Sequence, residues 1–271
     1  MVLNIEVEMK IALCFYGLVG SRADKNGNGI SLDPSLAYKL NYKNIIKDND
    51  VDVFIHSWSK NFENELVSLY NPVLHCIEEQ RDFPHSSKIA NNRDAIEIAY
   101  NVFSGLKRPT TIKSKIESNR KEAFRAFSRW YSNKRVLELK SEYEKTHNFK
   151  YDCVMVLRLD VGFYSKVDFS EYDMTYFYAS NWNDYPTKDN NFECNQKNNN
   201  LGKGFLDFWF FSNSDNMDEF STLFDDIGKY HVCPHRSSYQ HVTSFTDKIA
   251  YTMFRWNDFE MIRRKEFNSE L

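Results

Sequence analysis

The 271-residue sequence contains few glycines, prolines and cysteines, which number 9, 6 and 5, and its charges nearly balance. So little glycine and proline excludes collagen-like and linker-rich chains, and a hydrophobic content of 42% excludes an intrinsically disordered one. Lysine and arginine number 35 against 38 aspartates and glutamates, a net charge of −3, and no long run of one sign occurs. Nucleic acid is therefore not expected as a main partner. The composition, with 16% aromatic residues, predicts a folded globule.

The cysteines are odd in number and widely spaced, and no two of them form a CxxC unit. A reduced compartment is the simpler interpretation. The first ten residues, MVLNIEVEMK, lack the basic start and the apolar stretch of a secretory signal. The sequence contains no run of about 18 apolar residues, the length that is needed to span a bilayer. We therefore expect a cytoplasmic protein without a transmembrane segment, either soluble or attached to a membrane peripherally.

A strand, a helix and a second strand follow one another near the start of the chain. Residues 10–16 form a short apolar run that ends at the loop 17–22, residues 35–46 have helical spacing, and residues 51–58 return to strand character. A crossover of about 30 residues between two strands is typical of a βαβ unit in a parallel sheet. The sequence therefore predicts an α/β fold.

The rest of the chain continues this pattern, and we expect a single domain over residues 1–271. Residues 121–147 predict a helix with an aromatic face, and residues 151–161 predict a buried strand. We expect a variable helical or irregular insertion at about 60–120 and a helical carboxyl-terminal part at about 241–271. The other expected elements are a short helix at 61–70, strands at 73–77, 175–180 and 205–212, a helix at 215–224 and a polar loop at 231–240.

Charge appears in the strand at 151–161 only near its carboxyl end, as Arg158 and Asp160. An isolated buried charge costs many kcal/mol unless it is paired or bound to a ligand. Either the two side chains pair with each other, or they bind a ligand, because ligands bind at the carboxyl ends of strands in open α/β sheets. A Mg²⁺ or Mn²⁺ ion on Asp160, with the Arg158 guanidinium as a second phosphate contact, would suit a nucleotide diphosphate.

Four further residues are candidates: Gly17, Arg22, His56 and Asp207. Gly17 allows close approach of a backbone and Arg22 could meet a phosphate, although an ordinary turn explains the loop equally well. His56 lies near the end of its strand, where it either contacts the ligand or plays a structural role. Asp207 interrupts an apolar run, where burial would raise the pKa of its carboxyl and suit a general base; the alternative is a carboxylate that caps a neighbouring loop.

The remaining polar segments give weaker signals. His231, His235 and His241 are spaced 4 and 6 apart, which matches no standard zinc signature, so they are weak metal candidates. The loop 181–204 is rich in asparagine and contains Trp182 and Tyr185. This composition suits a sugar-contacting surface, and a solvated loop is the alternative.

Five segments, taken in order, resemble a group of GT-A-type glycosyltransferases found in bacterial surface-polysaccharide loci and in large DNA viruses. In that group the motif YDxVxxxRxD takes the place of the usual DxD metal motif. The segments are KIALCFYG (10–17), VDVFIHSW (51–58), WYSNK (130–134), KYDCVMVLRLD (150–160) and DFWFFSN (207–213). The resemblance extends from about residue 10 to 225.

The resemblance implies a GT-A-like, Rossmann-like fold with a mixed, mostly parallel central sheet flanked by helices. It implies sugar transfer from a nucleotide-diphosphate sugar to a hydroxyl of a glycan or glycoprotein acceptor. Tyr16, Gly17 and Arg22 then lie near the nucleotide, with Asp160 near a Mn²⁺ or Mg²⁺ ion on the diphosphate and Arg158 alongside. Because Arg158 stands where a DxD motif has its first aspartate, its guanidinium could do part of the work of the cation.

The same resemblance gives His56 a place in the nucleotide-sugar site and makes Asp207 the base that deprotonates the acceptor, if the reaction inverts. Two other functions remain open. A carbohydrate-binding module without catalysis would also use loops of aromatic and amide residues. A nucleotidylyltransferase is disfavoured because the chain has no glycine-rich, basic phosphate loop.

Overall fold

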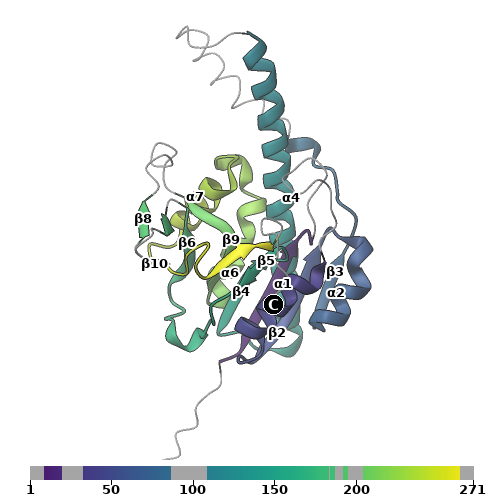
Figure 1. Ribbon diagram of the computed structural model, residues 1–271, viewed down its shortest axis with the longest axis vertical. Helices are drawn as coiled ribbons and strands as arrows, with labels where there is room; N and C mark the ends of the chain where they lie inside the picture. The colour runs from purple at the N-terminus through teal and green to yellow at the C-terminus, as the bar shows by residue number, and fades with distance from the viewer. Residues whose placement is uncertain are drawn as a thin grey trace, which may run out of the picture.

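A computed structural model describes residues 9–19, 33–86, 109–182, 184–186, 192–194 and 204–262, which form a central sheet with helices on its faces (Figure 1). The strands are β1 (Ile11–Gly17), β2 (Val51–Ser57), β3 (Leu74–Ile77), β4 (Cys153–Arg158), β5 (Val161–Phe163), β6 (Phe177–Asn181), β7 (Asp184–Pro186), β8 (Phe192–Cys194), β9 (Phe205–Ser212), β10 (Ile249–Tyr251) and β11 (Phe259–Met261). The α-helices are α1 (Pro34–Asn41), α2 (Glu63–Tyr70), α4 (Pro109–His147), α6 (Ser214–Ser221) and α7 (Pro234–Phe245). Shorter turns are the π-helical η1 (Tyr42–Ile46) and the 3₁₀ turns η2 (Lys60–Phe62), η3 (Phe169–Glu171), η4 (Thr222–Phe224) and η5 (Ile227–Lys229).

The main sheet has seven strands in the order β10-β6-β9-β4-β1-β2-β3. Its neighbouring strands are parallel except at β9, which runs antiparallel to both β4 and β6. Two small antiparallel pairs, β5 with β11 and β7 with β8, accompany it. The predicted α/β fold with a mostly parallel mixed sheet flanked by helices is therefore confirmed.

Strand β1 lies inside the sheet, between β4 and β2, and is apolar on both faces. Leu13 and Phe15 pack into the core beneath α2, while Cys14 and Tyr16 pack into the second core beneath α4. Its parallel register places Tyr16 beside His56 of β2 on one side and Arg158 of β4 on the other. The carboxyl ends of these three strands therefore meet at one edge of the sheet.

Helix α4 covers one face of the sheet and extends well beyond it at its amino-terminal end (Figure 1). Its 39 residues span about 58 Å at 1.5 Å per residue. Trp130 is 1% exposed and packs its ring against Phe210 and Phe220. The predicted aromatic face is confirmed, but the helix begins at Pro109, because a proline in the first turn lacks only an N–H that has no intrahelical partner.

Much of the region 60–120, where we expected an insertion, belongs to regular elements of the domain. Helix α2 packs Leu66 and Tyr70 into the core, and β3 pairs with β2 in the main sheet. Residues 109–120 belong to α4. Only 87–108 of the predicted insertion lie outside the described residues.

The expected polar loop at 231–240 is wrong from Pro234 onward, and the helical part expected from 241 is confirmed only as far as Phe245. Helix α7 begins at Pro234 and ends at Phe245, and β10 and β11 follow it. Its buried face contains Ser237 and Ser238, whose hydroxyls donate hydrogen bonds to the Pro234 carbonyl. These small polar residues pack like alanines, so the helical period is missing from the hydrophobic pattern. Residues 263–271 lie outside the described residues.

No helix among the described residues combines the length and the apolar character needed to cross a bilayer.

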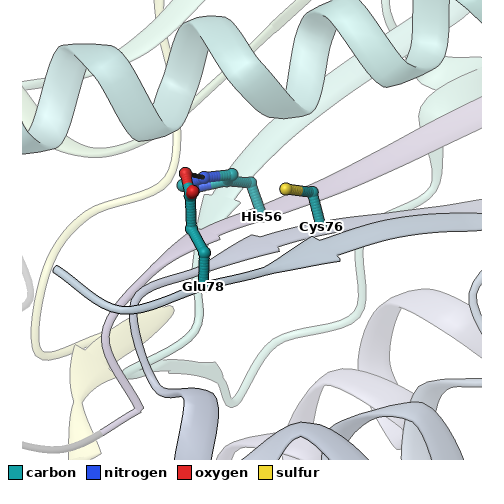
Figure 2. A group of neighbouring side chains, drawn as sticks. All are labelled: His56, Cys76 and Glu78. Carbon is teal, nitrogen blue, oxygen red and sulfur yellow. Dashed lines mark hydrogen bonds and ion pairs between the residues drawn. The ribbon is translucent and has the colours of Figure 1, made fainter. Parts of the chain in front are cut away.

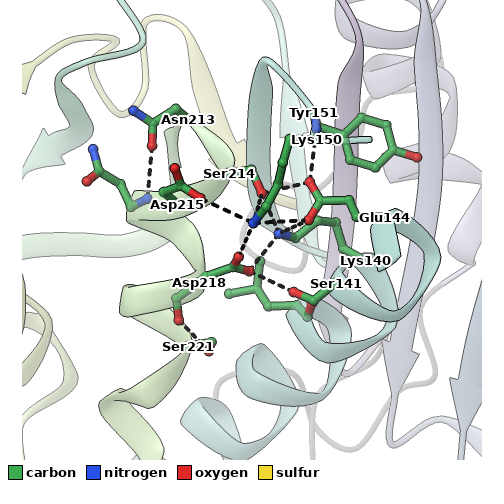
Figure 3. A network of polar contacts seen from close by, with 12 residues as sticks. Lys140, Ser141, Glu144, Lys150, Tyr151, Asn213, Ser214, Asp215, Asp218 and Ser221 are labelled. Atoms are coloured by element: carbon green, nitrogen blue, oxygen red, sulfur yellow. Dashed lines mark hydrogen bonds and ion pairs between the residues drawn. The ribbon is translucent and has the colours of Figure 1, made fainter. Parts of the chain in front are cut away.

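A buried ionic network ties α4 to α6 at the amino end of β4 (Figure 3). The ammonium group of Lys140, which is fully buried, donates to Glu144 Oε2 at 3.0 Å, Ser214 Oγ at 2.7 Å and Asp218 Oδ1 at 2.7 Å. The other Glu144 oxygen accepts the backbone N–H of Tyr151 at 2.9 Å. Every N–H of the ammonium group thus has an acceptor, which compensates for its loss of water.

Replacement of Lys140 by alanine should lower the free energy of unfolding by about 3–5 kcal/mol, because the buried Glu144 carboxylate then keeps only the more exposed Lys150 ammonium, 3.6 Å from Oε2. Urea denaturation measures the change. The matched control is Lys145→Ala in the same helix, whose exposed side chain should contribute no more than about 0.5 kcal/mol. Equal effects of the two substitutions would contradict this account of the network.

Candidate functional site

The candidate site lies at the edge of the sheet where β1, β2 and β4 end, which we call the carboxyl edge. Tyr16, His56 and Arg158 reach it from these parallel strands. Because β9 is antiparallel to β4, its first residues lie at the same edge, and Asp207 is the third of them. Ligands of open α/β sheets bind at this kind of edge.

Arg158 and Asp160 form a bidentate ion pair. Arg158 Nε lies 2.8 Å from Asp160 Oδ1, and Arg158 Nη2 lies 2.6 Å from Asp160 Oδ2. The residues are only 8% and 3% exposed. Burial alone would lower the pKa of the Arg158 guanidinium, but the neighbouring Asp160 charge raises it above its ordinary value. The pairing interpretation of these two residues is therefore confirmed.

This ion pair lies against the turn that follows β1. The backbone N–H of Leu159 donates to the Tyr16 carbonyl at 3.1 Å, and the Asp160 carbonyl accepts the N–H of Ile262 at 2.9 Å. The Tyr16 side chain is 1% exposed, and its hydroxyl donates to the Asp207 carbonyl at 3.3 Å. Burial raises the pKa of Tyr16 to about 12, so the phenol stays protonated. Tyr16 thereby connects β4 to β9 across the carboxyl edge.

Gly17 has a φ of +96°, a conformation that side-chain-bearing residues rarely adopt. Its N–H donates to Ser132 Oγ at 2.9 Å, and its carbonyl accepts the hydroxyl of Ser57 at 2.9 Å. The turn therefore requires glycine at this position. This agrees with the interpretation of the loop as an ordinary turn. Arg22, the predicted phosphate contact in this loop, lies outside the described residues.

Asp207 is buried between two residues from other elements. Its Oδ2 forms an ion pair with Arg129 of α4, and its Oδ1 lies 3.3 Å from Nδ1 of His235 at the start of α7. Burial in apolar surroundings favours the protonated carboxyl, but the Arg129 guanidinium beside it has the opposite effect and favours the carboxylate. Arg129 was not among the predicted site residues, because nothing in an aromatic helical stretch marks one arginine as facing the sheet.

His235 belongs to this group and does not form a metal cluster with His231 and His241. Its Nδ1–H donates to the Phe205 carbonyl at 2.9 Å, and its ring stacks on Trp182 with centroids 4.8 Å apart. Burial lowers its pKa to about 3, with the positive charge of Arg129 as the next cause. The imidazole is therefore neutral at physiological pH.

A third arginine pair lies near these residues, within the described part of the chain. Arg255 pairs with Glu260 through contacts of 2.8 to 3.2 Å, and Glu260 is 1% exposed. The guanidinium carbons of Arg158 and Arg255 lie 5.1 and 5.3 Å from the centre of the Phe208 ring. We name the three pairs Arg129–Asp207, Arg158–Asp160 and Arg255–Glu260 the arginine cluster. Its formal charges cancel.

His56 has a different setting. Its ring is fully buried, with Nδ1 2.7 Å from Ser132 Oγ and Nε2 3.2 Å from Glu78 Oε1. Burial lowers its pKa to about 4. The hydrogen bonds of the His56 ring are therefore directed toward Glu78, which follows β3, and toward Ser132 of α4, which also contacts Gly17. This agrees with the structural alternative for His56.

A cavity of about 480 Å³ opens between α7 and β10, and one of its lining residues, Gly204, lies against the backbone of His235. Its lining combines the phenol rings of Tyr239 and Tyr251 with hydrogen-bonding groups, and Tyr251 is 43% exposed. Gly204 separates the cavity from Trp182, and a Cβ there would lie 2.7 Å from the Trp182 ring. The other lining residues are Asn181, Thr243, Thr246, Asp247 and Ile249. The side chain of Tyr185, the second aromatic of the predicted sugar-contacting loop, lies outside the described residues.

No protein-family model matches the chain, and no curated protein matches it either.

The pKa of His235 gives a test of this geometry. Below pH 6.5 the unfolded chain gains a proton on this imidazole, whereas the folded protein does not until about pH 3, so stability falls as the pH falls. Between pH 7 and 5.5 the wild type should lose about 1 kcal/mol more than His235→Gln. Urea denaturation at both pH values measures this difference. The exposed His75→Gln variant should follow the wild type, and a His235→Gln variant that does the same would contradict the buried, neutral imidazole.

Proposed function

We propose that the protein is a nucleotide-sugar-dependent glycosyltransferase whose donor diphosphate binds at the arginine cluster. The observation that carries the proposal is the convergence of Arg129, Arg158 and Arg255 at the carboxyl edge. All three positive charges act on the pKa of His235, and two of them share the ring of Phe208. Guanidinium groups are the side chains best suited to bidentate recognition of phosphate.

The fold supports the proposal at the level of its architecture. The motifs that resemble GT-A-type glycosyltransferases fall on β1, β2, α4, β4 and β9. Strands β1, β2 and β4 end at the carboxyl edge, β9 begins there, and α4 contacts it through Arg129. A mixed, mostly parallel sheet is also what that resemblance implies. Fold likeness alone does not give a function, so the proposal depends on the charged residues.

The paired state of the cluster indicates how an anion would bind. In the described state each guanidinium already has a carboxylate, so a diphosphate must compete with Asp160, Asp207 or Glu260 for it. Arg129 and His235 give solvent its access, with side chains 20% and 23% exposed. A phosphate that accepts two N–H bonds from a guanidinium would replace the contacts that the carboxylate gives up. Stabilisation of the leaving diphosphate then supplies much of the catalysis.

Asp160, the predicted ligand of Mn²⁺ or Mg²⁺, does not fit that role as it stands. Both of its oxygens contact Arg158, whose positive charge repels a second cation. Among the described residues, the group of three histidine, cysteine or carboxylate ligands close enough to hold one ion is elsewhere, at His56, Cys76 and Glu78. We therefore derive the binding of the diphosphate from the guanidinium groups, and metal dependence becomes an arm of the experiment.

Asp207 is the residue we propose as the general base if the reaction inverts. Its carboxylate, which pairs with Arg129, is the group that would accept a proton from an acceptor hydroxyl. The cavity beside α7 supports a glycan or glycoprotein acceptor, because phenol rings stack on sugar rings while amides and hydroxyls bind their hydroxyl groups. If the reaction retains configuration, this role of Asp207 lapses.

Calorimetric titration with UDP and GDP, each with and without Mn²⁺, tests the diphosphate site. The wild type should bind at least one of them, and Arg158→Gln should weaken that binding about 10- to 100-fold, the value of a charged hydrogen bond. Asp160→Asn should remove any enhancement by Mn²⁺ if Asp160 holds the ion.

The matched control is Arg135→Gln, which removes a guanidinium paired with Glu138 on the surface of α4. It should bind like the wild type. Failure of the wild type to bind either nucleotide, or equal binding by the Arg158 and Arg135 variants, would contradict the proposal.

Release of nucleoside diphosphate from a panel of UDP- and GDP-sugars, with simple glycans as acceptors, tests catalysis. Asp207→Asn should lower turnover about 100-fold or more, because the substitution keeps the shape and removes the base. Nucleotide binding should persist or become tighter, because Arg129 loses the carboxylate that competes with the diphosphate. Asp215→Asn, whose side chain is 88% exposed, is the control and should keep full turnover.

The cavity also favours a second function, a carbohydrate-binding module without catalysis. It predicts glycan binding in the absence of nucleotide, no turnover by the wild type and unchanged glycan affinity in Asp207→Asn. That combination of results would replace the transferase proposal with this one.

A further inference from the structure

Three metal-binding side chains lie together on β2 and the end of β3, apart from the arginine cluster (Figure 2). His56 and Cys76 are register partners in the parallel pair, so their side chains point to the same face of the sheet. Glu78 follows two residues after Cys76 and therefore shares that face. The potential ligand atoms of the three residues all lie within 4.8 Å of one another.

The spacing of two of these atoms already suits a tetrahedral ion. His56 Nε2 and Glu78 Oε1 are 3.2 Å apart. Two ligands at about 2.0 Å from a tetrahedral Zn²⁺ ion lie about 3.3 Å apart. Cys76 is a free, half-buried thiol on the same side, so it can complete a three-residue set by a small rotation of its side chain.

The donor types select the metal. One imidazole nitrogen, one thiolate sulfur and one carboxylate oxygen form a set that Zn²⁺ accepts, whereas Mg²⁺ and Mn²⁺ prefer oxygen alone. His56 is neutral because burial lowers its pKa to about 4, and the pKa of Glu78 is lowered by its hydrogen bonds to Arg81 and His56 despite partial burial. Both side chains are therefore in the protonation state that a metal requires.

The surrounding residues can orient the ligands. Arg81 donates from Nε at 3.0 Å and from Nη2 at 2.7 Å to Glu78 Oε2, which leaves Oε1 directed at His56. Ser132 Oγ lies 2.7 Å from His56 Nδ1 and 3.3 Å from the His56 carbonyl. A metal on Nε2 requires its proton to move to Nδ1, which can then donate to Ser132 while the serine hydroxyl donates to the carbonyl. Such outer-shell hydrogen bonds are typical of metal-bound histidines.

We propose that His56, Cys76 and Glu78 bind one Zn²⁺ ion, with a water molecule in the fourth position. Binding releases the Cys76 proton to solvent, while the imidazole keeps its proton on Nδ1. The ion cross-links β2 to β3, and Ser132 connects it to α4 and to the N–H of Gly17. The site therefore stabilises the turn that follows β1 at the carboxyl edge. The zinc proposal does not depend on the proposed transferase activity.

The test is a titration of the full chain, first stripped of metal with a chelator, against Zn²⁺ in competition with a chromophoric chelator. We expect one equivalent bound with a dissociation constant below 1 μM, and a rise in melting temperature on loading, since a ligand of the native state stabilises it. Co²⁺ should give a thiolate-to-cobalt charge-transfer band. Cys76→Ser and Glu78→Gln should each weaken zinc binding at least tenfold, and Cys76→Ser should abolish the cobalt band.

The controls are Cys233→Ser, which removes a thiol of similar exposure elsewhere, and Glu79→Gln, which removes the exposed carboxylate next along the chain. Both should bind like the wild type. Absence of submicromolar zinc binding by the wild type would overturn the proposal. Binding that is unchanged in Cys76→Ser, or weakened equally by Cys233→Ser, would also overturn it. Because the readout is metal affinity, either result leaves the nucleotide titrations unaffected.

Discussion

The carboxyl edge of the sheet depends on the compensation of buried charge. Arg158 and Asp160 are almost inaccessible to water, and each is stable there because the other supplies two short hydrogen bonds. The same rule applies to Glu260 with Arg255 and to Asp207 with Arg129. Removal of any one member leaves an uncompensated charge, so these pairs hold together β4, β9, α4 and the segment after β10. An anionic ligand can take the place of the carboxylate in such a pair, because the guanidinium is then still compensated.

The strands could be predicted because their burial is recorded directly in the residue pattern. β1, β4 and β9 are continuous apolar runs, which is how strands covered on both faces appear in sequence. Helix α7 could not, because the residues on its buried face include Ser237, Ser238 and His241, which satisfy their polar atoms within the protein. Hydrophobic periodicity finds elements that bury apolar groups and misses those that bury bonded polar ones.

The charged residues of the carboxyl edge could be predicted in part, for a related reason. Position on a strand identifies the carboxyl edge, so Arg158, Asp160 and Asp207 could be proposed from their places in apolar runs. The other two arginines of the cluster, Arg129 and Arg255, come from a long helix and from the segment after β10, and tertiary packing alone decides which arginines of those elements face the sheet. Sequence spacing therefore gives both members of the Arg158–Asp160 pair and one member of Arg129–Asp207. It gives neither member of Arg255–Glu260.

The direction of β9 decides which charges meet. In a parallel arrangement Asp207, the third residue of β9, would lie at the opposite edge of the sheet, near the Lys140 network. Because β9 runs antiparallel to β4, Asp207 instead lies beside Tyr16, whose hydroxyl donates to its carbonyl. The two edges consequently differ in kind. At the amino edge one buried ammonium is saturated by three acceptors from α4 and α6, whereas the carboxyl edge gathers three guanidinium groups, which a polyanionic ligand can share.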